Sequence, residues 1–298
     1  MQEIGLSNLQ SLERELHKPL PLRRMLFTGI MTGLAFALTA LALLPLFAII
    51  WEIMRQGLPK LSWEVLVSLP APVGVEDAPN GFANAIVGTI TMVIIATIFS
   101  VPLGIMTGIF LAEFTKVPKT VGLIRFITVI LSSVPSIIIG VFAYGVFVIT
   151  TKKFSAIAGG FALGTIMLPI VALTTEEALK LIPVSYRLGS AALGGGRFQT
   201  IMKIVVPAAL PGITTGVLLA VARAAGETAP LMFTALFSQF WQEGLMSPTP
   251  SLPVLIYNYA SSPFPEQNAI AWTASFVLLV LVFITSILSR LIIRNRLK

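Results

Sequence analysis

The fold class is decided by a stretch without charge, residues 86–111, which reads IVGTITMVIIATIFSVPLGIMTGIFL. A helix needs about 20 consecutive apolar residues to cross the roughly 30 Å hydrocarbon core of a bilayer, so this stretch is long enough. Other stretches qualify in the same way. The predicted spans are Met25 to Ile50, Ile86 to Leu111, Leu123 to Ile149, Phe154 to Leu173, Ala209 to Phe237 and Ala271 to Ile293. The sequence therefore predicts an all-α integral membrane protein with six transmembrane helices.

The composition supports this class and excludes several others. Of 298 residues, 56% are hydrophobic and 11% are charged, whereas soluble globular domains carry about 25% charged residues. The absence of cysteine excludes disulfides, thiolate metal sites and a cysteine nucleophile, and the single histidine, His17, cannot build a zinc site. The net charge of +7 comes from bases that flank apolar runs, so it indicates orientation rather than a nucleic-acid partner.

Lysine and arginine accumulate in cytoplasmic loops, and their distribution predicts the topology. One set of segments holds Arg14, Lys18, Arg23, Arg24, Lys116, Lys119, Arg125, Lys180, Arg187, Arg197, Lys203, Arg290, Arg294, Arg296 and Lys298. The other set holds only Arg55, Lys60, Lys152 and Lys153. We therefore expect both termini in the cytoplasm. The predicted parts are a cytoplasmic segment 1–24, a membrane domain 25–298, external loops 51–85, 150–153 and 238–270, and a cytoplasmic loop 174–207.

The cytoplasmic loop 174–207 is predicted to be helical. Thr174 and Glu177 have the spacing of a capping box, which predicts a helix start, and Pro183 predicts its end. Ser185 can cap a second short helix that stops at the glycines beginning with Gly194. The loop therefore contains an elbow of short helices.

A third helix is predicted after these glycines, and it is amphipathic. One face carries Phe198, Ile201, Met202 and Val205, opposite polar side chains that begin with Arg197. Such a face can insert into a groove of a partner protein, or it can rest on lipid headgroups. The residues alone leave both alternatives open.

The fifth predicted span carries two charged side chains. Arg223 and Glu227 are four residues apart and are expected to share a helix face, where they can neutralise each other in part. A charge at the centre of a membrane helix costs at least about 2.5 kcal/mol, which makes the pair a candidate functional site. Gly226 and Pro230 loosen the helix and favour a lined cavity for an anion. The alternative is a pair that only holds helices together.

Two further features of the spans predict helix geometry rather than chemistry. Pro135 is expected to kink the third span near Leu131, where serine hydroxyls can satisfy the freed carbonyl, and the kink serves packing or gating. Gly104 and Gly108 have the spacing that allows two helices to approach closely.

The string Ala222 to Leu231, ARAAGETAPL, strongly resembles the signature of the A-type permeases of the bacterial phosphate-specific (Pst) ABC importers. Similar stretches are Asn84 to Thr89, Val134 to Gly140, Phe233 to Ala235 and Leu252 to Asn258, so the resemblance covers most of the chain from Gly81 onward. The run from Ala191 to Gly194, followed by Ile204, Val206 and Pro207, resembles the cytoplasmic EAA loop of ABC importer permeases. Leu188 stands where that pattern has its glutamate.

The resemblance implies a type I ABC importer permease with a coupling-helix loop, which moves inorganic phosphate through the inner membrane of a prokaryote and is not itself an enzyme. It implies a second, PstC-type permease, a homodimeric PstB-type ATPase and an external PstS-type phosphate-binding protein as partners. The chain has no phosphate-binding loop of the form Gly-x-x-x-x-Gly-Lys-Ser/Thr, so ATP and Mg would bind the separate ATPase. The implied substrate path comprises Arg223, Glu227 and Thr228. The implied coupling residues are Ala191, Ala192, Gly194, Arg197, Phe198, Ile201, Met202 and Pro207.

Other functions remain open from the residues alone. An ABC permease for another oxyanion, such as sulfate or molybdate, would gain nothing from an acceptor like Glu227. A secondary transporter or channel could use Arg223 and Glu227 as a relay, but no inverted repeat is evident. A membrane enzyme would need paired carboxylates, and Glu176 and Glu177 are adjacent, so they do not share a helix face.

Overall fold

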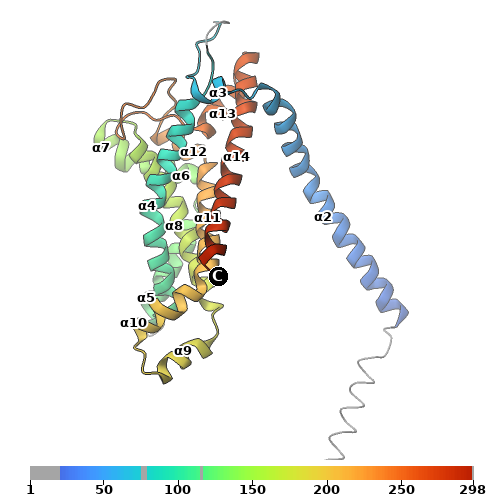
Figure 1. Cartoon of the computed structure of the whole chain (residues 1–298), viewed down its shortest axis with the longest axis vertical. Coiled ribbons are helices and arrows are strands. Elements are labelled where there is room, and N and C mark those ends of the chain that lie inside the picture. The colour runs from blue at the N-terminus through green and yellow to red at the C-terminus, as the bar shows by residue number, and fades with distance from the viewer. Residues whose placement is uncertain (1–20, 75–78, 115–116, 297–298) are drawn as a thin grey trace, which may run out of the picture. The chain divides into compact units, whose positions relative to one another are not determined.

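The computed structural model describes residues 21–74, 79–114 and 117–296, which form helices and loops without any strand (Figure 1). The chain divides into two units, residues 1–52 and residues 53–298, and each is described by itself. The first unit holds most of α2 (Leu22–Gly57), part of an apolar region with a mean hydropathy of 2.4. Most of the predicted cytoplasmic segment 1–24 lies outside the described residues.

The second unit is a helical bundle. Its helices are η1 (Leu58–Lys60), α3 (Trp63–Val67), α4 (Ala83–Glu113), α5 (Pro118–Ser133), α6 (Ser136–Ala143), η2 (Tyr144–Val148), α7 (Ile149–Thr151), α8 (Ala156–Lys180), α9 (Val184–Ala192), α10 (Arg197–Thr200), η3 (Ile201–Val205), α11 (Val206–Ala225), α12 (Ala229–Thr234), α13 (Leu252–Ala260) and α14 (Pro265–Arg296). In Figure 1, α9 and α10 lie at one end of this bundle, and α3 and α13 lie at the other.

Six spans are present if one of them is counted as bent. Five helical stretches are long and apolar enough to cross a membrane, and α5 with the helix Ser136–Thr151 forms a sixth that bends by 102°. The predicted kink at Pro135 is therefore confirmed, and it is a sharp bend. The hydroxyls of Ser132 and Ser133 donate to the carbonyls of Val129 and Ile130, both at 2.7 Å. Both bonds go to carbonyls one or two residues before Leu131, so the prediction that these serines bond to the Leu131 carbonyl is wrong.

The centre of the bundle is the pair of helices α4 and α8, which make the most extensive helix contact in the second unit. A Cβ at Gly104 would lie 2.8 Å from Val171 Cβ, and one at Gly108 would lie 2.5 Å from Thr175 Cβ. The predicted close approach at these glycines is thus confirmed, and only glycine allows this spacing. Helix α11 packs on the other side of α8, where Gly216 faces Thr174.

The ends of the fourth and fifth spans differ from the predicted ends. Helix α8 continues to Lys180, so Thr174 lies inside the helix and its hydroxyl donates to the Ile170 carbonyl at 2.7 Å. The predicted capping box at Thr174 is therefore wrong. A second correction concerns the third predicted helix, because Arg197 to Ala225 form one continuous helical stretch of 29 residues. The predicted span ends where polar residues begin, but the polar residues at the end of α8 are packed inside the bundle. Local polarity was therefore a poor guide to this boundary.

Candidate functional site

The fifth span is interrupted between Ala225 and Ala229. Helix α11 ends at Ala225, and the amides of Gly226 and Glu227 donate to the carbonyls of Arg223 and Ala224 at 3.1 and 3.2 Å. These short-range bonds tighten and close the last turn of the helix. Helix α12 begins at Ala229, and Pro230 occupies its first turn, where the missing N–H costs nothing. The predicted loosening at Gly226 is confirmed, but the helix does not continue to Phe237.

The structure brings Arg223 and Glu227 together across this break. Arg223 Nε lies 3.5 Å from Glu227 Oε1, although Glu227 lies beyond the last residue of α11 and so does not share its face. The glutamate side chain is 15% exposed and the arginine side chain is 57% exposed. Among the described residues, no hydrogen bond involves the two terminal nitrogens of this guanidinium. They form a planar fork that fits two oxygens of a carboxylate or phosphate.

The break is held in place by the short helix α12. A Cβ at Gly140 of α6 would lie only 2.6 Å from the Cα atom of Pro230, so the two backbones touch. Thr234 is buried, its hydroxyl donates to the Pro230 carbonyl at 2.8 Å, and its carbonyl accepts from the amide of Ser155 at 3.0 Å. The bent third span and the start of α8 thus fix the position of the residues that follow Glu227.

Thr228 lies in a different environment from the charged pair. It lines an open cavity of about 420 Å³ with Gly226, α13 and α14. The remaining lining residues are Ile53, Pro253, Ile256, Ser275, Leu278, Leu279 and Val282. The cavity is mostly apolar, and neither Arg223 nor Glu227 lines it. The three predicted path residues are therefore adjacent in sequence, but they do not line one cavity.

The elbow of short helices is formed by α9 and α10. Pro183, rather than the predicted Ser185, precedes the first residue of α9. The turn between the two helices needs a glycine because Gly194 has a φ of 77°. The hydroxyls of Ser190 and Thr200 lie 2.8 Å apart and join the two helices. The elbow is therefore a defined turn.

The residues predicted to face a partner are divided between the surface and the interior. Phe198 and Met202 are 73% and 46% exposed, whereas Ile201 and Val205 are buried, and Val205 packs in a cluster with residues of α8 and α11. The π-helical turn η3 shifts this part of the helix, so the predicted four-residue apolar face does not exist as one surface. Exposed positions among the predicted coupling residues are Ala191, Ala192, Gly194, Arg197, Phe198, Met202 and Pro207. Leu193, which was not predicted, is 91% exposed.

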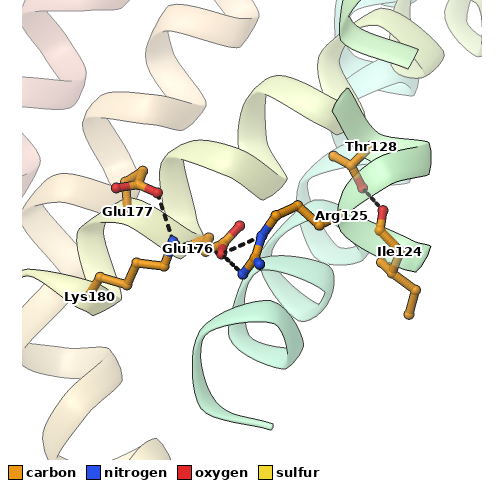
Figure 2. Close-up of polar contacts among 6 residues, drawn as sticks. All are labelled: Ile124, Arg125, Thr128, Glu176, Glu177 and Lys180. Atoms are coloured by element: carbon orange, nitrogen blue, oxygen red, sulfur yellow. Dashed lines mark hydrogen bonds and ion pairs between the residues drawn. The ribbon is translucent and has the colours of Figure 1, made fainter. Parts of the chain in front are cut away.

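A buried carboxylate in α8 was missed by the sequence reasoning. Glu176 has a side chain that is 2% exposed, and it pairs with Arg125 of α5 and with Lys180, whose Nζ lies 2.8 Å away (Figure 2). Arg125 Nε also donates to the same oxygen at 3.1 Å. Two cations therefore compensate a carboxylate that would otherwise be costly to bury. The sequence did show that Glu176 flanks an apolar run, but its partner Arg125 lies 51 positions away, so the pair could not be predicted from spacing.

A second shielded carboxylate, Glu113, ends α4 and contacts two arginines of the elbow. Its side chain is 10% exposed, and Arg187 Nη2 lies 2.5 Å from Glu113 Oε1. Within the described part of the chain, no group of three or more His, Cys, Asp or Glu residues could hold a metal ion.

Comparisons with known proteins agree with this architecture. Residues 104–298 match the family described as binding-protein-dependent transport system inner membrane component. The phosphate transport system permease protein PstA of Haemophilus influenzae is 40% identical over 268 residues, which are 90% of this chain and 94% of that protein. A probable PstA of Methanocaldococcus jannaschii is 37% identical over 261 residues, covering 87% and 90% of the two chains.

A solved structure shows the same fold at lower sequence identity. A chain of the MetNI methionine ABC transporter, in an inward-facing conformation, superposes with a TM-score of 0.58 at 22% identity, over 72% of this chain and 94% of that one. The bundle is therefore a type I ABC permease fold. The chain belongs to the binding-protein-dependent transport system inner membrane components and, within them, to the PstA family of phosphate transport system permeases.

Proposed function

We propose that this chain is the membrane permease subunit that passes inorganic phosphate into the cytoplasm. The chain is a transport subunit rather than an enzyme, and ATP hydrolysis takes place on a separate subunit. One observation carries the proposal: at a break in a membrane-spanning helix, the two terminal nitrogens of Arg223 have no hydrogen-bond partner in the described part of the chain, while its Nε atom lies 3.5 Å from Glu227 Oε1. A guanidinium never loses its charge, so this fork remains able to accept an oxyanion throughout transport.

Glu227 gives the site a means of choosing among oxyanions. A carboxylate accepts hydrogen bonds, so it can accept one from a protonated phosphate oxygen, whereas a fully ionised oxyanion would place acceptor against acceptor. Its low exposure keeps water from screening this contact. Phosphate, which carries a proton near neutral pH, is therefore favoured over sulfate and molybdate.

The elbow is the proposed contact with the ATPase. Its exposed apolar side chains, Leu188, Leu193 and Phe198, are 65%, 91% and 73% exposed and suit an apolar groove. In this arrangement both termini and the elbow lie in the cytoplasm. The proposed partners are a PstC-type permease, a homodimeric PstB-type ATPase that binds ATP and Mg, and an external PstS-type phosphate-binding protein. The second permease would complete the path around Arg223.

The test is uptake by the complete transporter in proteoliposomes. Arg223→Gln should abolish phosphate uptake while leaving subunit assembly intact, and Arg223→Lys should retain only a small part because it lacks the planar fork. Arg24→Gln, the same charge change near the start of α2, serves as the matched control. Normal uptake by Arg223→Gln would reject the path assignment, and wild-type uptake of sulfate in place of phosphate would identify a different oxyanion.

A further inference from the structure

The end of α4 and the elbow are joined by one carboxylate. Glu113 is the last residue of α4, and Arg187 lies near the middle of α9. Arg187 Nε is 3.3 and 3.4 Å from the two carboxylate oxygens, and its Nη2 atom is 2.5 Å from Oε1. The side chains are only 10% and 26% exposed, so this is a shielded pair with several charge-assisted bonds.

The same guanidinium also reaches the end of α8. Arg187 Nη1 donates to the carbonyl of Ile182 at 2.8 Å, and Nη2 donates to the carbonyl of Leu179 at 3.2 Å. These carbonyls lie where a helix runs out of backbone partners, so a cation there satisfies them. One side chain of α9 therefore binds the ends of both central helices.

A second arginine of the elbow converges on the same point. Arg197, the first residue of α10, donates from Nη2 to the backbone carbonyl of Glu113. Its guanidinium also lies over the ring of Phe114, 4.8 Å from the centroid, which is within cation–π range. Both short helices of the elbow are thus attached to the last residue of α4.

Apolar burial does not provide a comparable attachment for α9. Ser190 is its only buried residue, and Leu188 is 65% exposed. The contacts of Arg187 therefore link this helix directly to α4 and α8, whereas Ser190 links it to α10. The missing glutamate of the EAA pattern leaves Leu188 in that place, whereas Glu113 supplies an acidic group from a different helix.

We propose that Glu113 is a positioning residue that clamps the elbow to the central helices α4 and α8. When the ATPase displaces the elbow, the clamp makes the ends of these helices move with it, so that hydrolysis drives the change of access. This role rests on the proposed transport function. Without the clamp, α9 would still dock but would move independently of α4 and α8, and ATP would be hydrolysed with less transport.

The first measurement is the amount of phosphate transported per ATP hydrolysed by the complete transporter in proteoliposomes. Glu113→Gln keeps the shape but removes the charge, and we expect the ratio to fall about fivefold or more while the subunits still copurify. Glu177→Gln is the matched control, because it removes the same charge near the end of α8, where the Glu177 side chain is 71% exposed and pairs with Lys180. An unchanged ratio in Glu113→Gln, or an equal fall in both variants, overturns the proposal.

The second measurement is amide hydrogen exchange of residues 184–192, made on the full-length permease and therefore independent of transport. Glu113→Gln should speed exchange in α9 about fivefold or more, with no change in Glu177→Gln. Unchanged exchange in Glu113→Gln overturns the clamp even if the variant fails to assemble with the ATPase. A wild-type complex that does not transport phosphate would refute the proposed function and would leave this comparison valid.

Discussion

Adding one methyl group at Gly140 should disturb the charged site without changing any charge. A Cβ at this position would lie 2.6 Å from Pro230 Cα, whereas ordinary contacts are 3.4–4 Å, so α6 and α12 would have to separate by about 1 Å. Such overpacking costs about 1–3 kcal/mol, and the better helix propensity of alanine returns about 0.5–1 kcal/mol. For Gly140→Ala we therefore expect a net loss of about 1–2 kcal/mol.

This loss can be measured as a fall in the Tm of the purified transporter. Size-exclusion chromatography of samples heated to different temperatures gives the Tm. At about 2–4 °C per kcal/mol, Gly140→Ala should lower Tm by roughly 2–8 °C and should also reduce phosphate uptake. Gly145→Ala is the matched control because no atom lies within 4 Å of a Cβ there, and it should be neutral or slightly stabilising. Equal Tm and uptake in the two variants would refute the reasoning, since the contact with Pro230 would then not exist.

Three other predictions concern the charged and apolar groups. Glu227→Gln should shift the pH profile of phosphate uptake, because it weakens the choice between protonation states, and an unshifted profile would leave Glu227 as a helix contact only. Glu176→Gln should destabilise the permease by about 1–3 kcal/mol in thermal unfolding, because two cations lose their buried partner, whereas Glu177→Gln at an exposed pair should cost under about 0.5 kcal/mol. The double variant Leu193→Ala with Phe198→Ala should reduce the amount of ATPase that copurifies severalfold, because both side chains are exposed on the elbow. An unchanged amount of copurified ATPase would count against docking at the elbow.

The spans could be predicted from the sequence because bilayer thickness demands a length that few other structures need. The bend at Pro135 and the close approach at Gly104 were likewise local signals, and the structure confirms both. The end of α8 could not be predicted in this way. Its last turns carry Glu176, which is charged and yet buried, and its partner Arg125 lies on another helix. Only the tertiary fold brings that partner close.

Part of the candidate site could be predicted because its residues lie close together in the sequence. Spacing along the chain was enough to pair Arg223 with Glu227, and the ion pair survives although the helix ends between them. The apolar face of the elbow was predicted incorrectly, because Ile201 and Val205 are buried and a π-helical turn changes the phase of the helix. Glu113 gave no local sign of its role, since its partners Arg187 and Arg197 lie 74 and 84 positions away.

The uninterrupted helical stretch from Arg197 to Ala225 has a mechanical consequence. At about 1.5 Å per residue its 29 residues form a rod roughly 40 Å long, with the elbow at one tip and Arg223 near the other. A rod of this length acts as a lever, so a tilt of a few degrees at one tip displaces the far tip by more than 2 Å, on the order of the spacing between a guanidinium and its anion. If Arg223 binds phosphate as proposed, its contact with the anion can therefore be altered from the elbow without any loop carrying the force.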